Sequence, residues 1–121
     1  MRFFFWLFRI DVRYPPIERL RKAEKGKIVM MYVTKIKMKP GCYRSNNLVE
    51  IDELYITGCS NPGYFKKAII HDHVEKNPGS IQVNIWPNPN VVDAVSQNGE
   101  KYVRSSPNAY GHDNLLSLPR E

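Results

Sequence analysis

The sequence predicts a small α+β domain in which one helix packs on the apolar face of an antiparallel sheet. Three patterns predict it: polar and apolar residues alternate from Tyr32, apolar residues recur at helical spacing from Phe65 to Val74, and Asn98-Gly99 is typical of a tight hairpin. The expected order is strand, strand, helix, strand, strand, strand. Such an order favours a sheet with the helix across one face.

The first predicted strand begins at Tyr32 and ends at Pro40-Gly41. Its alternation predicts two faces, one with Tyr32, Thr34, Ile36 and Met38, the other with Val33, Lys35, Lys37 and Lys39. The second predicted strand runs from Leu48 to Thr57. Its pattern changes phase near Glu53, which predicts a β-bulge there.

The helix is expected to begin at Ser60 or Asn61, either of which could cap it, with Pro62 in its first turn. Asn77-Pro78-Gly79 should end it. Three strands follow, starting at Ile81, Val91 and Lys101. Asn98-Gly99 predicts a type I′ turn between the last two, because both central positions of that turn need a positive φ.

Charge divides the 121 residues into a basic leader, residues 1–30, and a nearly neutral domain, residues 31–121. The leader holds eight lysines and arginines against three acidic residues, and the domain holds ten against nine, so the net charges are +5 (8 − 3) and +1 (10 − 9). The basic isoelectric point, which would indicate a nucleic-acid or acidic-membrane partner, therefore belongs to the leader. The domain is long enough to bury a modest core without disulfides or metal.

The leader opens with an aromatic run, Phe3 to Phe8, which is far shorter than the roughly 20 apolar residues of a transmembrane helix. No small-residue cleavage site of a secretory signal follows it. Weak contact with a membrane surface and a disordered segment are two interpretations. The third is a misannotated start, because Glu24-Lys25-Gly26 requires purine-rich codons that look like a ribosome-binding site shortly before Met30-Met31.

The end of the chain carries a recurrent motif. Its residues are Lys101, Tyr102, Arg104, Asp113, Asn114, Leu115, Leu116, Leu118 and Pro119. In order and spacing the motif resembles the signature of domain-of-unknown-function family 3892, a family of short microbial domains without an assigned activity. The resemblance covers residues 31–121 and departs from the family pattern at Ser105, Asn108 and Ala109. It implies a fold and a structural role for the motif, and it implies no reaction.

Arg104 is the motif residue with a functional alternative. It lies on a predicted strand, and we expect a charge-assisted hydrogen bond from Arg104 to Asp113. The alternative is that Arg104 contacts an anion or a partner. The leucines that follow Asp113 are expected to pack over the open edge of the sheet.

Four potential zinc ligands occur, but their spacing argues against a metal site. His71 and His73 are two residues apart on a predicted helix, so their side chains diverge, with His71 in solvent and His73 at the edge of the core. Cys42 and Cys59 form no Cys-x-x-Cys pair and fall at opposite ends of a predicted hairpin, too far apart for a disulfide. We expect no metal or other cofactor, and two free thiols fit a reducing cytoplasm.

No catalytic motif is recognisable, so the leading hypothesis is a non-catalytic intracellular binding or interaction domain. It would use the outer face of the sheet and the loop from Pro107 to His112 to bind an unknown protein or a second copy of itself. A small enzyme using Arg104, Asp113 and His112 rests on residue types alone.

The alternative hypothesis is an accessory nucleic-acid-binding protein. Its phosphate contacts would come from the basic leader and from Lys35, Lys37 and Arg44. Glu50 and Asp52 are expected opposite the two strand lysines, where they would partly neutralise them. The aromatic residues that could stack on bases are Tyr43, Tyr64, Trp86 and Tyr110.

Overall fold

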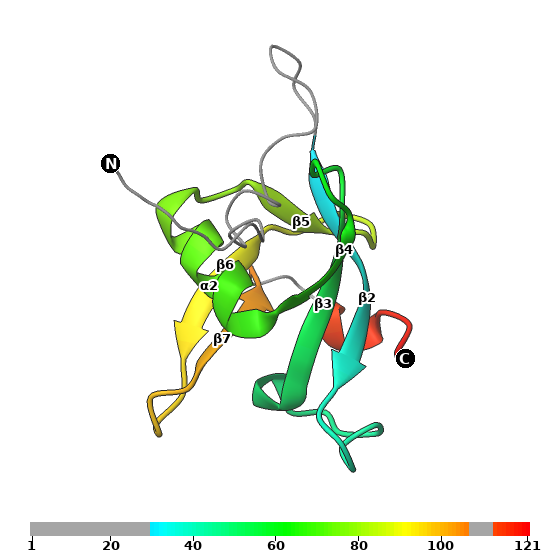
Figure 1. Cartoon of the computed structure of the whole chain (residues 1–121), viewed down its shortest axis with the longest axis vertical. Coiled ribbons are helices and arrows are strands. Elements are labelled where there is room, and N and C mark those ends of the chain that lie inside the picture. The colour runs from blue at the N-terminus through cyan, green and yellow to red at the C-terminus, as the bar shows by residue number, and fades with distance from the viewer. Residues whose placement is uncertain (1–29, 107–112) are drawn as a thin grey trace, which may run out of the picture.

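The structure, a computed structural model, describes residues 30–106 and 113–121 of the chain (Figure 1). A four-stranded sheet has the strand order β4-β3-β2-β5, and β6 and β7 form a two-stranded hairpin. The described residues contain one α-helix, α2 (Lys67–Lys76), so the predicted α+β class is confirmed. The strands are β2 (Met31–Met38), β3 (Ile51–Thr57), β4 (Gly63–Lys66), β5 (Ile81–Val83), β6 (Val91–Val95) and β7 (Lys101–Ser105). Two 3-10 helices are η1 (Leu48–Glu50) and η2 (Asn114–Ser117).

The sheet is mixed, which corrects the expectation that all its strands are antiparallel. β2 pairs antiparallel with β3, and β3 pairs antiparallel with β4, but β5 runs parallel to β2. β4 and β5 therefore point the same way. Parallel strands need a long crossover connection, usually a helix, and α2 is the helix between β4 and β5.

The second edge of β2 is covered by two different segments. β5 pairs with its first half, from Met31 to Val33. Beyond that, the Ile36 amide donates to the Pro119 carbonyl at 2.9 Å, and the Glu121 amide donates to the Ile36 carbonyl at 3.0 Å. The last residues of the chain thus continue the sheet in line with β5.

Strand β4 occupies the place where the sequence predicts the start of the helix. Tyr64 pairs with Tyr55 and Phe65 pairs with Leu54 on β3, so the helix begins only at Lys67. Aromatic residues favour strands, and pairing with β3 overrides the capping signal of Ser60 and Pro62. The predicted end of the helix is confirmed, since α2 stops at Lys76.

Two register skips change which side chains face the core. The pairing of β2 with β3 passes over Thr34, so Val33 before the skip and Ile36 after it are both buried. The predicted division of β2 into two faces is therefore wrong for the residues before the skip. A second skip passes over Asp52 on β3, beside the bulge predicted near Glu53. The segment that was expected to start the second strand is the 3-10 helix η1.

The predicted hairpin at Asn98-Gly99 is confirmed, but the predicted turn type is wrong. Gly99 has a φ of 82°, whereas Asn98 does not share a positive φ. The Gly99 amide donates to the Ser96 carbonyl and the Ser96 amide to the Glu100 carbonyl, each at 2.9 Å. A three-residue loop that ends in one left-handed residue replaces the two-residue type I′ turn.

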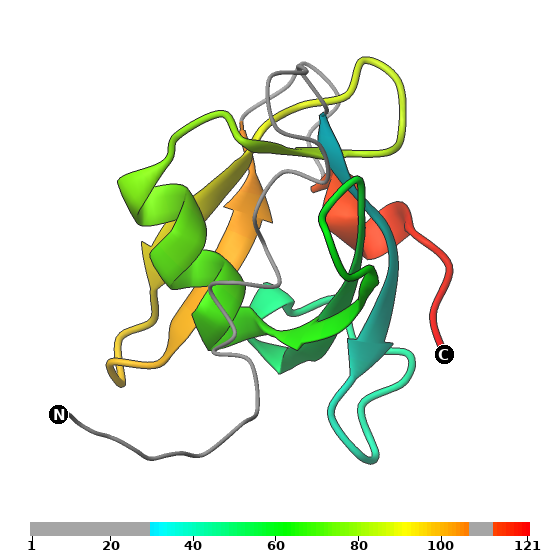
Figure 2. The same ribbon diagram turned by 45° about the horizontal axis from the view of Figure 1, so that its top comes forward.

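The core lies between the four-stranded sheet, α2 and the hairpin. Figure 2 shows α2 and the β6-β7 hairpin on one side of the molecule and β2 with β3 on the other. The buried side chains include Val33, Ile36, Leu54 and Phe65 from the sheet, Ile70 and Val74 from α2, Val91 and Val103 from the hairpin, and Leu115 and Leu118 near η2. Across the described ranges, no helix has the length and apolar character that crossing a bilayer requires.

Candidate functional site

The outer face of the four-stranded sheet carries tyrosines and lysines in neighbouring rows. We use "outer face" for the solvent side of β2, β3 and β4, opposite the core. In one row, Tyr55 on β3 lies between Lys35 on β2 and Tyr64 on β4. In the next row, Glu53 on β3 lies between Lys37 on β2 and Lys66 on β4. Cross-strand neighbours in such rows are close enough for their side chains to touch.

The two tyrosine rings fix the two lysines. The ring centroids of Tyr55 and Tyr64 lie 5.1 Å apart in an edge-to-face arrangement, at an interplanar angle of 87°. The Lys35 ammonium lies 4.7 Å from the Tyr55 centroid, and the Lys37 ammonium lies 4.8 Å from the Tyr64 centroid. Both are cation–π distances. The face therefore presents its charges in an ordered arrangement.

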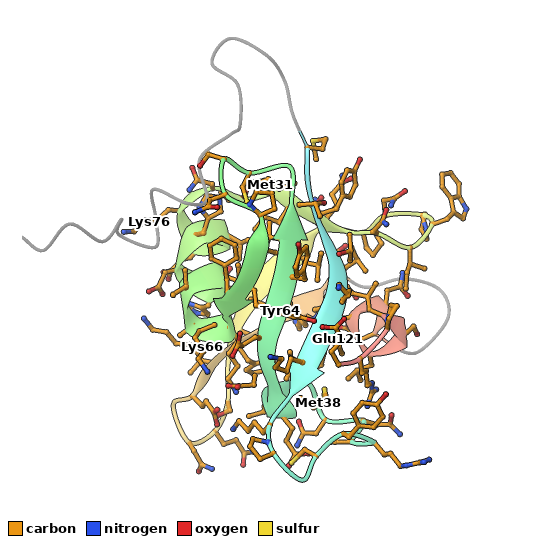
Figure 3. All side chains as sticks on the ribbon, turned by 45° about the vertical axis from the view of Figure 1, so that its right-hand side comes forward. Met31, Met38, Tyr64, Lys66, Lys76 and Glu121 are labelled. Atoms are coloured by element: carbon orange, nitrogen blue, oxygen red, sulfur yellow. The ribbon has the colours of Figure 1, made fainter. Side chains whose placement is uncertain are left out.

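A carboxylate already lies on this face. The Tyr64 hydroxyl donates to Glu121 Oε1 at 2.5 Å, and the Lys35 ammonium donates to Oε2 at 3.0 Å (Figure 3). The hydrogen bond from Tyr64, followed by the one from Lys35, holds the pKa of Glu121 below its usual range, and the charge of Lys37 adds to the effect. Burial, and next the bond to Glu121, raises the pKa of Tyr64 to about 12.

Arg120 positions the residue that supplies this carboxylate. Its guanidinium donates to the carbonyls of Tyr43, Ser45 and Leu116 at 2.7, 2.8 and 3.0 Å. The backbone of the segment is thus fixed to a loop and to η2, as well as to β2. The Glu121 side chain remains 49% exposed, so it can leave the outer face without unpairing the segment.

The acidic neighbours of the strand lysines differ from those predicted. Lys35 pairs with Glu121, and the residue opposite Lys37 is Glu53. Asp52, at the register skip, pairs instead with Lys66, whose ammonium lies 3.2 Å from Asp52 and 3.2 Å from Glu53.

Glu50 lies away from the outer face, because it is the last residue of η1 and accepts a hydrogen bond from the Ser45 hydroxyl. Its predicted position opposite a strand lysine is therefore wrong. The reason is that the chain is helical at this point, so the alternation of a strand does not apply.

Asp113, which is central to the terminal motif, serves the backbone. One carboxylate oxygen accepts from the Leu115 amide at 2.8 Å and caps η2, and the other accepts from the Ser105 amide at 2.8 Å. The predicted bond from Arg104 to Asp113 is absent. Asp113 bonds backbone amides because it directly precedes η2, whose first amide groups lack intrahelical partners.

The other motif residues divide between packing and the surface. Asn114, Leu115 and Leu118 are buried, and Leu116 packs against the core. Exposed Lys101 forms an ion pair with Asp72 at 2.9 Å. The remaining motif side chains are half-buried Tyr102 and Arg104 and exposed Pro119.

A group of metal-ligand types lies on α2. Ligand atoms of His71, Asp72 and Glu75 lie within 4.8 Å of one another. His71 is only 3% exposed and its Nδ1 lies 2.9 Å from Asp72 Oδ1, so the prediction that His71 lies in solvent is wrong. α2 packs against both strands of the β6-β7 hairpin, and His71 is one of its buried residues. The ammonium of Lys101 lies 2.9 Å from Asp72 Oδ1 and already supplies a positive charge there.

The cysteines remain free thiols, one half-buried and one buried. Burial, followed by the nearby charge of Glu50, raises the pKa of the Cys42 thiol above its usual value. The thiolate, which is the nucleophilic form, is therefore disfavoured at Cys42.

Several predicted features lie outside the described residues. They are the aromatic run Phe3 to Phe8, residues 1–29 of the leader to which the start-site hypothesis applies, and the loop from Pro107 to His112. Arg44, a predicted phosphate contact, is exposed between the two loop residues whose carbonyls bind Arg120.

The sequence predictions missed two components of the outer face. Tyr55 could have been found, since it lies two residues from Glu53 on one strand and thus shares its face. No local pattern could have found Glu121, because it is 57 residues from Tyr64 and its position depends on the folded chain.

Comparison with known proteins identifies one relationship. The family model for DUF3892, described as a protein of unknown function, matches residues 18–119. The match begins within the basic leader and includes the whole of the terminal motif. No curated protein and no solved structure matches the chain.

Proposed function

This chain belongs to the DUF3892 family of unknown function, and we propose from its structure that it is a non-catalytic binding domain. Its outer face would bind an acidic group of a partner protein, through Lys35, Lys37 and Tyr64. The observation that carries the proposal is the carboxylate of Glu121, which Tyr64 and Lys35 already hold on this face.

The chemistry of the outer face supports an acidic ligand. A carboxylate accepts charge-assisted hydrogen bonds, which are shorter and stronger than neutral ones. The Lys35 ammonium and the Tyr64 hydroxyl both donate to such a group, and the Lys37 ammonium lies nearby over the Tyr64 ring. Because the rings hold both lysines in place, binding would cost less side-chain entropy than it would for free lysines.

A non-catalytic role is supported by the state of the reactive groups. Both oxygens of Asp113 accept from backbone amides, and the Cys42 thiol is held in its neutral form. The proposal includes a cytoplasmic location, which the free thiols of Cys42 and Cys59 support because such thiols persist under reducing conditions.

Single-stranded nucleic acid is the second candidate ligand. The observation that favours it is the placement of Lys35 over Tyr55 and of Lys37 over Tyr64, since aromatic rings stack on bases and lysines contact phosphates. Arg44 and the basic leader would add phosphate contacts. The net charge of +1 on residues 31–121 (10 − 9) favours the acidic protein instead.

Fluorescence anisotropy with two labelled peptides tests the proposal. One peptide alternates glycine with glutamate, and the matched peptide alternates glycine with glutamine. The wild-type domain should bind the first peptide and not the second. Lys35→Met and Tyr64→Phe should each weaken binding about tenfold or more, because each removes a hydrogen bond to a charged group.

Two control variants match these substitutions. Lys76→Met removes an exposed lysine of α2, and Tyr102→Phe removes the hydroxyl of a half-buried tyrosine of β7, in the hairpin. Neither should change the affinity for the glutamate peptide. Equal binding of the two peptides, or no binding of either, would refute the proposal, and preference for an oligothymidylate of the same length would favour nucleic acid.

A further inference from the structure

We infer that Glu121 is a built-in competitor of the partner: its carboxylate occupies the position on the outer face that an acidic side chain of the partner takes. The inference rests on the proposed function. It adds that the face is self-occupied in the free protein and that binding requires the Glu121 side chain to leave.

The Tyr64 hydroxyl cannot donate to two carboxylates at once. A tyrosine hydroxyl has one hydrogen, and that of Tyr64 is directed to Glu121 Oε1. The Lys35 ammonium donates to the other oxygen of the same carboxylate. The ammonium has further hydrogens, so an incoming acidic side chain has to replace Glu121 at the Tyr64 hydroxyl and shares or takes over its place at Lys35.

Release of Glu121 requires only a side-chain movement. The side chains of Lys35 and Glu121 are 36% and 49% exposed, so their ion pair lies at the surface, where such pairs contribute little to stability. The three bonds of Arg120 to carbonyls and the pairing with Ile36 can remain intact. The competitor thus stays tethered beside the face at a high effective concentration.

The charges that remain after release fit an acidic segment of a protein. Lys35, Lys37 and Lys66 then oppose Asp52 and Glu53, so the face carries one net positive charge (3 − 2). A single carboxylate can use the Lys35 and Tyr64 donors. A run of phosphates would instead pass close to Asp52 and Glu53, since both lie beside Lys66 at the next row.

The geometry also explains why the occupant is a glutamate of this segment. Glu121 follows Arg120, which is bridged in parallel to Ile36 on β2, so the segment runs along the same edge as Lys35 and Lys37. In Figure 3, Tyr64 and Glu121 are labelled over the face turned to the viewer, and Lys76 lies at the margin of the molecule.

The test compares the wild-type domain with Glu121→Gln and Glu75→Gln, using the labelled glutamate peptide as the probe. Glu121→Gln should bind about threefold to tenfold more tightly, because the amide competes poorly for donors that prefer a charged oxygen. Glu75→Gln removes the same charge from an exposed site on α2 and should leave the affinity unchanged.

Other outcomes separate this inference from the proposed function. If wild type and Glu121→Gln bind the peptide equally and Lys35→Met binds it more weakly, Glu121 is not a competitor. The proposed binding of an acidic group by the outer face would then remain supported. No binding by any of the variants would refute both. If Glu121→Gln binds an oligothymidylate more tightly than the wild type does, but not the peptide, the assignment of the ligand to an acidic protein is wrong.

Discussion

Lys67 Nζ lies 2.5 Å from Glu100 Oε2, although the two residues are 33 positions apart. Lys67 begins α2, and Glu100 lies in the loop between β6 and β7. The same ammonium donates to the Val49 carbonyl, and the same carboxylate oxygen lies 2.7 Å from the Lys39 ammonium, just beyond β2. These contacts join the helix, the hairpin and the end of a sheet strand through one carboxylate.

Glu100→Gln should lower the melting temperature at neutral pH, and it should make the melting temperature depend less on pH in the acidic range. Hydrogen bonds from Lys39 and Lys67 lower the pKa of Glu100 from 4.5 to about 2. A carboxyl whose pKa is lowered by folding stabilises the folded state above its unfolded pKa, and this contribution is lost as pH falls from about 4.5 toward 2. Thermal unfolding of the wild type and of Glu100→Gln at several pH values in this range measures the effect. If the melting temperatures of the two proteins fall in parallel as the pH falls, the prediction is wrong.

Lys67→Met should reduce the free energy of unfolding by about 1 to 3 kcal/mol, because it removes a nearly buried donor to a carbonyl and a carboxylate. The neighbouring residue gives a matched control. Lys66 forms two ion pairs, but its side chain is 59% exposed, so Lys66→Met should lower the free energy of unfolding much less than Lys67→Met. Denaturant unfolding compares them, and equal losses would show that the burial of Lys67 does not matter.

Asp113→Ala should destabilise the domain by about 1 to 3 kcal/mol. The substitution removes the side-chain cap of η2 and leaves the Ser105 amide without its acceptor. Asp93→Ala, at an exposed position of β6, is the control and should have a much smaller effect. If the two variants unfold at the same denaturant concentration, the structural role assigned to Asp113 is wrong.

Glu121→Gln should lower the pKa of Tyr64 from about 12, since the substitution removes the carboxylate that stabilises the protonated hydroxyl. Part of the increase should remain, because burial is its larger cause. Alkaline absorbance titration gives the value after subtraction of the titration of Tyr64→Phe. The pKa of Tyr64 should stay at about 12 in Glu75→Gln. An unchanged pKa in Glu121→Gln would mean that the two side chains do not interact in solution.

Local patterns in the sequence predicted the features that depend on neighbouring residues. The stop of α2 before Pro78 and the hairpin at Gly99 both follow from conformational limits of nearby backbone. The family signature also predicted the relationship that the family match confirms.

Other features were missed or wrong because they depend on pairing with another segment of the chain. β4 exists because Tyr64 and Phe65 pair with β3, and the phase of β2 changes where its register with β3 skips Thr34. The candidate site depends on Glu121, whose partners Lys35 and Tyr64 are 86 and 57 residues away. Periodicity carries no information on contacts at such separations.

The covering of β2 by Pro119 to Glu121 has a further consequence for association. Unpaired strand edges are templates for pairing with other chains, and natural sheets commonly shield them. The amide and carbonyl of Ile36 are both bonded to this segment, and β5 covers the earlier part of the same edge. Removal of the segment would expose backbone groups beside a tyrosine-rich face, so a shortened domain should aggregate more readily than the full chain.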